Sequence, residues 1–216
     1  MSDHYLDMEH YSRRSQFDLF RKMSYPYVGL TVNVDITALM KCIKEKGLPF
    51  YLTFLYAAAR TANSIPQFRQ RLHEDRILEY DHCISSYTLA LEDENYCYCT
   101  ADDRFPFEDY LKDAKRRQEE ARLEKHISDG EDEDRLFFFS SLPWVSYTSI
   151  IQPVPMPADS NPRITWGKYF KSEDGVKIPV SVLVNHALMD GYHISKFFSG
   201  LQEKCSETGW LRNGNP

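Results

Sequence analysis

Hydrophobic and polar positions separate helices from strands in the N-terminal part of the chain. Residues 28–34, VGLTVNV, alternate between apolar and polar positions, as a half-buried strand does. Residues 35–47, DITALMKCIKEKG, start with an Asp or Thr cap, carry one apolar stripe and end at Gly47, which predicts a helix. Residues 12–23, SRRSQFDLFRKM, place phenylalanines at helical spacing behind Ser12, which we expect to cap a further helix.

The central segments continue this mixture of helices and strands. Residues 50–65 are apolar nearly all round and lie between two prolines, so we expect a buried helix there. Residues 76–100 are rich in β-branched and aromatic side chains, which predicts a strand pair that turns at Asp81 and His82. Residues 107–126 form a charged amphipathic pattern typical of a surface helix.

The C-terminal pattern is a hairpin followed by a helix. Residues 163–185 read as two strands that turn at 173–175, and residues 193–205 carry one apolar stripe that would pack on a sheet. Helices and strands alternate irregularly, and no repeat or linker divides the sequence. We therefore predict an α+β fold, a two-layer sandwich of a mixed β-sheet with helices packed on it, as a single domain over residues 1–216.

Charge and hydropathy exclude several classes of protein. The chain of 216 residues has a formal net charge of -6, without the clustered Lys and Arg that bind phosphates, so we do not expect a nucleic-acid partner. No apolar stretch approaches the roughly 20 residues that span a bilayer, and the N-terminus is too polar for a secretory signal. We expect no membrane association and a cytoplasmic location.

The cysteines favour a packing role. There are five, with no C-x-x-C pair, and Cys97 and Cys99 would lie on one face of a strand without a nearby histidine. We expect small core residues here, and neither a structural zinc nor a disulfide framework.

The stretch LVNHALMDGYH, residues 183–193, carries the candidate chemistry. His186 follows a strand pattern directly, and Asp190 precedes a helix pattern, so a side chain there would be exposed on a rigid support. Histidine is suited to take up and return a proton near neutral pH. From spacing alone, a helix cap and a packing histidine are the favoured interpretation. A serine hydrolase gains no support without a G-x-S-x-G elbow, and a metal site lacks a third ligand beside His186 and His193.

Other segments of the chain favour a catalytic role for His186 over a packing role. The segment VNHALMDGYHISKFFSGLQEKC resembles the C-terminal signature of the chloramphenicol acetyltransferases, and the similarity continues through LPWVSYTSI, TWGKYF, VDITALMKCIK and RRSQF in the family's order. The resemblance covers almost the whole chain. It implies a homotrimer with active sites at the subunit interfaces, acetyl-CoA as co-substrate and no metal.

The resemblance also implies roles for single residues. His186 corresponds to the general base, and Ser149 to the hydroxyl that stabilises the tetrahedral oxyanion. Thr165 corresponds to a pocket residue that acts through water, and Phe20 to a residue that lines the acceptor pocket. A base and a hydrogen-bond donor are what transfer from a thioester to an alcohol requires.

Two more positions complete the expected site. Asp190 corresponds to a structural residue that pairs with Arg13 and holds the catalytic loop. Asn185 stands where the family usually has a first histidine, and we expect this departure to alter packing or acceptor preference.

The expected activity is acetyl transfer from acetyl-CoA to a hydroxyl of chloramphenicol by direct general-base attack in a ternary complex, with a role in antibiotic resistance. Two alternatives remain. The acceptor could be a different hydroxylated small molecule, or the protein could be a trimeric relative without catalytic activity.

Overall fold

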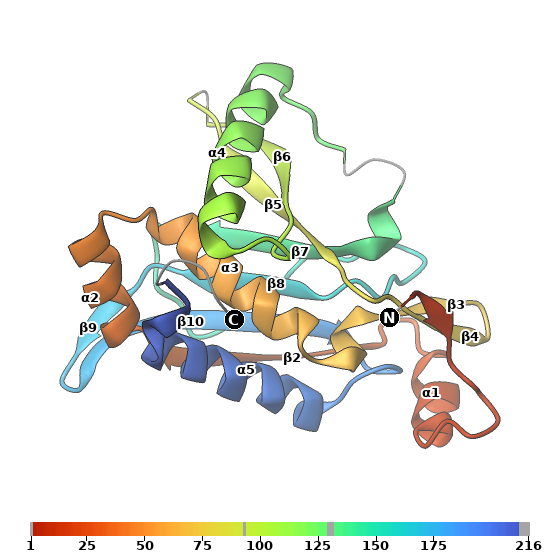
Figure 1. Cartoon of the computed structure of the whole chain (residues 1–216). Coiled ribbons are helices and arrows are strands. Elements are labelled where there is room, and N and C mark those ends of the chain that lie inside the picture. Colours follow the sequence, from red (N-terminus) through yellow and green to blue (C-terminus); the bar gives the residue numbers. More distant parts are fainter. Residues whose placement is uncertain (1, 93, 129–131, 212–216) are drawn as a thin grey trace.

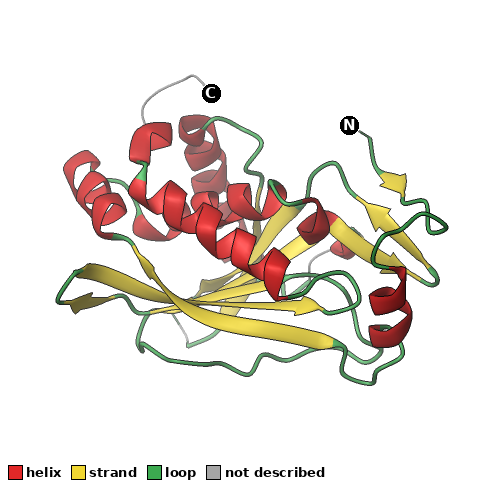
Figure 2. Ribbon diagram, turned by 90° about the horizontal axis from the view of Figure 1, so that it is seen from below, coloured by secondary structure: helices red, strands yellow, loops and turns green. Residues whose placement is uncertain are grey.

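A computed structural model describes residues 2–92, 94–128 and 132–211 and shows a mixed sheet covered by helices on one face (Figures 1 and 2). The main sheet has the strand order β2-β10-β8-β7-β5-β6, with β9 beside β10. β7 runs parallel to both β5 and β8, whereas the other pairs are antiparallel, so the prediction of an α+β fold with a mixed sheet is confirmed. The strands are β2 (Tyr27–Asp35), β5 (Ile84–Ala90), β6 (Tyr96–Ala101), β7 (Leu136–Leu142), β8 (Arg163–Gly167), β9 (Phe170–Ser172) and β10 (Gly175–Asn185).

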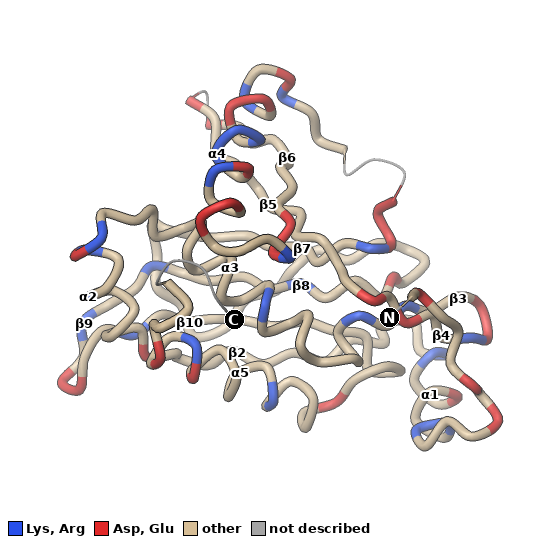
Figure 3. Tube along the Cα trace, viewed as in Figure 1, with Lys and Arg blue, Asp and Glu red and all other residues tan. Residues whose placement is uncertain are grey.

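The helical layer lies on one side of this sheet (Figure 2). Its helices are α2 (Thr37–Lys46), α3 (Phe50–Asn63), α4 (Phe107–Glu124) and α5 (Gly191–Ser206), while the short α1 (Arg14–Phe20) lies apart from them at one end (Figure 1). Both acidic and basic residues lie along α4 (Figure 3). The long helices predicted for the central and C-terminal segments are thus confirmed. Among the described residues, short 3-10 helices span Pro66–Arg69, Glu133–Arg135 and Thr208–Leu211.

The core lies between β10 and the helices. Val180, Val182 and Val184 of β10 are at most 1% exposed, because they alternate onto the face that the helices cover. Phe197 and Leu201 of α5 are completely buried. The predicted core role of Cys97 and Cys99 also agrees with the structure, where both are free and buried.

The expected strand pair over residues 76–100 is wrong in its pairing. A separate three-stranded sheet has the order β1-β4-β3, with bounds β1 (His4–Tyr5), β3 (Gln70–His73) and β4 (Arg76–Glu79). β5 instead pairs with β6. The physical reason lies at Cys83, whose backbone N–H and carbonyl both bond the Asn63 side chain at 2.9 Å. This contact holds the segment at the end of α3, so residues 81–82 do not turn the chain back on itself.

The helix ends show which capping predictions hold. Gly47 ends α2 in the left-handed conformation with φ of 62°, as predicted. The N-cap of α1 is Arg13 and not Ser12, and no side chain caps that helix, so the expectation for Ser12 is wrong. α1 begins one residue later than expected, at Arg14, and the Arg13 side chain is directed to Asp190.

Candidate active site

The turn between β10 and α5 presents His186 at one end of the main sheet. The backbone N–H groups of Leu188 and Met189 both donate to the carbonyl of Asn185, each at 3.1 Å. The N–H of His186 donates to the carbonyl of Pro26 at 2.7 Å, which ties the turn to the segment before β2. Backbone bonds on both sides therefore fix the position of His186.

The ring of His186 is held with one nitrogen available for proton transfer. Its Nδ1 lies 2.8 Å from the carbonyl oxygen of Met189. A carbonyl only accepts hydrogen bonds, so Nδ1 carries the proton in the neutral ring and Nε2 carries the lone pair. The Phe20 ring stacks on the imidazole, with centroids 3.8 Å apart and planes 13° from parallel. Nε2 is thus an oriented base.

Asp190 joins this turn to α5 and to the N-terminal segment. Its carboxylate caps α5 by accepting from the N–H of Tyr192 at 3.0 Å, and it lies 2.9 Å from Nδ1 of His193. Arg13 donates to its other oxygen. Partial burial would raise the pKa of Asp190, but the hydrogen bond and charge of Arg13 outweigh it and lower that pKa to about 2. The carboxylate is a fixed anion that braces the turn.

Asn185 stabilises the turn through its side chain, a role that the sequence pattern does not predict. It is completely buried, and its Nδ2 donates to the carbonyl of Asp159 at 2.9 Å. Its Oδ1 accepts from the N–H of Ala187 at 3.0 Å, so the side chain also stabilises the turn from inside. The Asp159 carboxylate is in turn bound by Arg163. No signal in the sequence links positions 159 and 185.

Ser149 and Thr165 lie in another part of the chain. Ser149 is exposed in the loop between β7 and β8, and the neighbouring Tyr147 donates to the carbonyl of Thr165 at 2.9 Å. The Thr165 hydroxyl is buried and donates to Gln152 at 3.0 Å. Thr165 stands opposite Ser181, five residues before His186, which is about 16 Å along β10 at roughly 3.3 Å per residue. A single chain therefore places Thr165 well away from the base.

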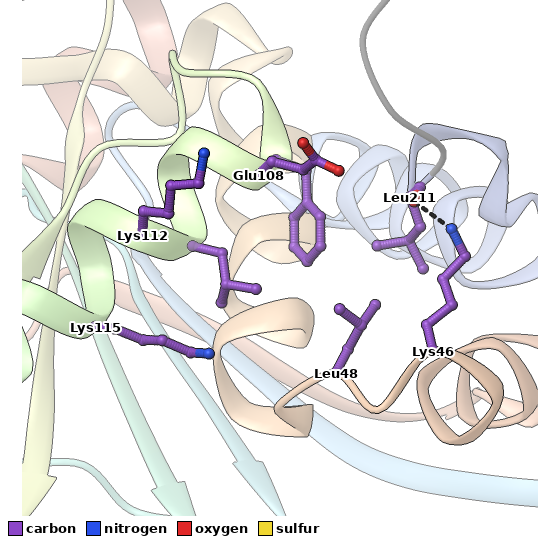
Figure 4. Close-up of a pocket in the computed structure, with 8 residues that line it drawn as sticks. Lys46, Leu48, Glu108, Lys112, Lys115 and Leu211 are labelled. Atoms are coloured by element: carbon purple, nitrogen blue, oxygen red, sulfur yellow. Dashed lines mark hydrogen bonds between the residues drawn. The ribbon is translucent and has the colours of Figure 1, made fainter.

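A cavity of about 490 Å³ opens elsewhere, between α2 and α4 (Figure 4). Three lysines, Lys46, Lys112 and Lys115, surround its apolar floor. None of its lining residues belongs to the predicted site.

The architecture is shared with known acetyltransferases. A solved chloramphenicol acetyltransferase matches with a TM-score of 0.80 at 23% identity, over 93% of this chain and 98% of that one. A dihydrolipoamide acetyltransferase from Azotobacter vinelandii matches with a TM-score of 0.69 at 18% identity, over 92% and 88% of the two chains. These two acetyltransferases therefore share the fold of this chain.

Sequence comparison defines the family. The family model described as chloramphenicol acetyltransferase matches residues 1–202. A chloramphenicol acetyltransferase from Clostridium butyricum is 33% identical over 99% of this chain and 100% of its own length. The chain belongs to the chloramphenicol acetyltransferase family.

Asp190→Asn should destabilise the protein in a pH-dependent way. The lowered pKa means that the carboxylate contributes stability that is fully present above about pH 3.9, its unfolded value, and is lost as pH falls through about 2. We expect a loss of about 1–3 kcal/mol at pH 5 to 7, measured by thermal unfolding, that shrinks between about pH 4 and 2. Asp18→Asn, on an exposed pair with Arg14, is the control and should change little. An equal loss at all pH values would contradict this account.

Asn185→Ala should loosen the turn that carries the base. Two hydrogen bonds disappear inside a buried site, and a misplaced imidazole lowers kcat by about 10–100-fold, with a smaller effect on KM. Steady-state kinetics measures this effect. Asn95→Ala, at an exposed position between β5 and β6, is the matched control. Wild-type kcat in Asn185→Ala would show that the side chain does not position His186.

Proposed function

We propose that the protein transfers the acetyl group of acetyl-CoA to a hydroxyl of chloramphenicol. Membership of the chloramphenicol acetyltransferase family supports both substrates, and residues 1–216 act as one acetyltransferase domain in this proposal. The observation that carries the chemistry is the bond from His186 to the Met189 carbonyl, because it leaves Nε2 as the basic nitrogen.

The reaction then proceeds in a ternary complex. Nε2 of His186 takes the proton of the acceptor hydroxyl as the oxygen attacks the thioester carbonyl. The Ser149 hydroxyl donates a hydrogen bond to the oxyanion of the tetrahedral intermediate. The intermediate collapses by breaking the carbon–sulfur bond, and the proton on Nε2 passes to the departing CoA thiolate. No covalent acyl-enzyme and no metal take part in these steps.

The remaining site residues support this chemistry. Arg13 and Asp190 hold the turn, and Phe20 holds one face of the imidazole and lines the acceptor pocket. Thr165 contributes to the pocket through a water molecule. The contact between Arg13 and Asp190 and the stacking of Phe20 on the imidazole support these roles.

A homotrimer would complete the site. Within one chain Thr165 lies about 16 Å along β10 from His186, so a neighbouring copy can bring its own Thr165 and Ser149 to this base. Apolar side chains exposed around that loop and on β2 support such a contact. They include Leu30, Val32, Trp144, Val145 and Ile151.

We place the protein in the cytoplasm, where acetyl-CoA is available as co-substrate. Within the described ranges, no helix has the length and apolar character needed to cross a membrane. Acetylation of chloramphenicol there would serve antibiotic resistance.

His186→Ala should lower the turnover number by about 10²–10⁴-fold, because the acceptor hydroxyl loses its base. The assay follows release of free CoA thiol with acetyl-CoA and chloramphenicol. His126→Ala, which removes an exposed histidine after α4, should remain fully active. Thiol release with other alcohols but not with chloramphenicol would move the proposal to a different acceptor. No release with any alcohol, from the wild type and His186→Ala alike, would identify a non-catalytic relative.

A mixing experiment tests whether two chains share one site. His186→Ala and Ser149→Ala should each be nearly inactive alone. Unfolding and refolding an equal mixture should restore about a quarter of wild-type activity, because about one interface in four then combines an intact His186 with an intact Ser149. Mixing without unfolding is the control. If both residues of a site came from the same chain, the mixture would remain inactive.

A further inference from the structure

A second cluster of ionisable side chains lies at the open end of the β5–β6 hairpin. Ser85 of β5 pairs with Ala101 of β6, so the residues before β5 and after β6 meet at this end. There, His82 is 8% exposed, Asp102 is 9% exposed and Asp103 is 1% exposed. Nε2 of His82 lies 3.2 Å from Oδ1 of Asp102 and 3.4 Å from Oδ1 of Asp103. None of these residues holds His186.

Two buried atoms in this cluster have no hydrogen bond. Across the part of the chain that the structure describes, neither Nε2 of His82 nor Oδ2 of Asp103 has a partner with hydrogen-bond geometry. The two oxygens near Nε2 are close enough to attract a proton on it, yet they lie off its axis. A buried carboxylate oxygen and ring nitrogen left in this way are costly and call for an explanation.

The spacing fits ligands around a metal ion. In a tetrahedral zinc site with bonds of about 2.0–2.1 Å, neighbouring ligand atoms are about 3.3 Å apart and flank the nitrogen axis instead of lying on it. The three ligand atoms also lie within 4.8 Å of one another. From these observations we propose that His82, Asp102 and Asp103 bind a divalent transition metal of the zinc type.

A neighbouring cavity gives this site an opening. It has a volume of about 300 Å³ and is lined by both His82 and Asp103, so water can reach the ion and fill a fourth position. Asn63 donates to Oδ1 of Asp103 at 2.9 Å and orients that carboxylate, as outer contacts of metal ligands do.

Nearby cations and protons compete with a metal ion for the ligand atoms of this cluster. Arg104 donates to both oxygens of the Asp102 carboxylate, with its Nε 3.1 Å from Oδ1 and 3.0 Å from Oδ2, so a metal ion would share Oδ1 with this guanidinium. Arg60 and Lys204 also line the cavity. Burial lowers the pKa of His82, but the two aspartates of the cluster raise it by more, so the net shift of this pKa is upward. A metal ion therefore competes with a proton for the ring nitrogen.

Cobalt titration tests the site directly. The full chain, stripped with a chelator, should bind one Co²⁺ ion with the visible absorption of four-coordinate cobalt, and Zn²⁺ should displace it. Asp103→Asn keeps the oxygen that Asn63 binds but removes the charge, and should weaken binding at least about tenfold. His73→Gln is the matched control, since Nε2 of His73 already bonds Asp134 at 2.7 Å. It should bind as the wild type does.

A second variant keeps the test decisive. If Asp103→Asn does not fold, His82→Gln replaces it, and Zn²⁺ should raise the melting temperature of the wild type but not of this variant. No bound Co²⁺ in the wild type would overturn the proposal. Equal affinity in the wild type and in the folded cluster variant would overturn it as well.

Discussion

The ion pair between Arg13 and Asp190 is the contact on which the site depends. It joins the segment before α1 to the first turn of α5, across a separation of 177 positions in the sequence. Because Arg13 is also the residue before α1, the pair fixes where that helix lies and hence where Phe20 meets the imidazole. One charged contact thus sets both the turn that carries His186 and the ring that covers it.

Within that frame, a backbone carbonyl and not a carboxylate bonds the His186 ring. The Met189 carbonyl fixes the tautomer, while Asp190 is engaged by Arg13 and by the N-terminus of α5. Asn185 shows how the family's usual histidine can be absent without loss of the turn, since an amide both donates to Asp159 and accepts from Ala187.

Local patterns predicted the elements better than their partners. The helices over residues 50–63 and 107–124 follow from periodicity, because each buries a face that its own sequence defines. β4 and β5 lie in different sheets because Asn63, which lies outside both strands, holds the segment between them, so no local pattern contains this outcome. In the site, the motif pointed to His186 and Asp190, whereas the bond from Asn185 to Asp159 joins two segments that only the fold brings together.

The position of β2 affects the tendency of the protein to aggregate. β2 ends the main sheet, and its nine residues pair with β10 on one side only in the described structure. Long edge strands with exposed apolar side chains, here Leu30 and Val32, are templates for aggregation. The yield of newly made chains would therefore depend on how many of them associate wrongly through this edge before it is covered.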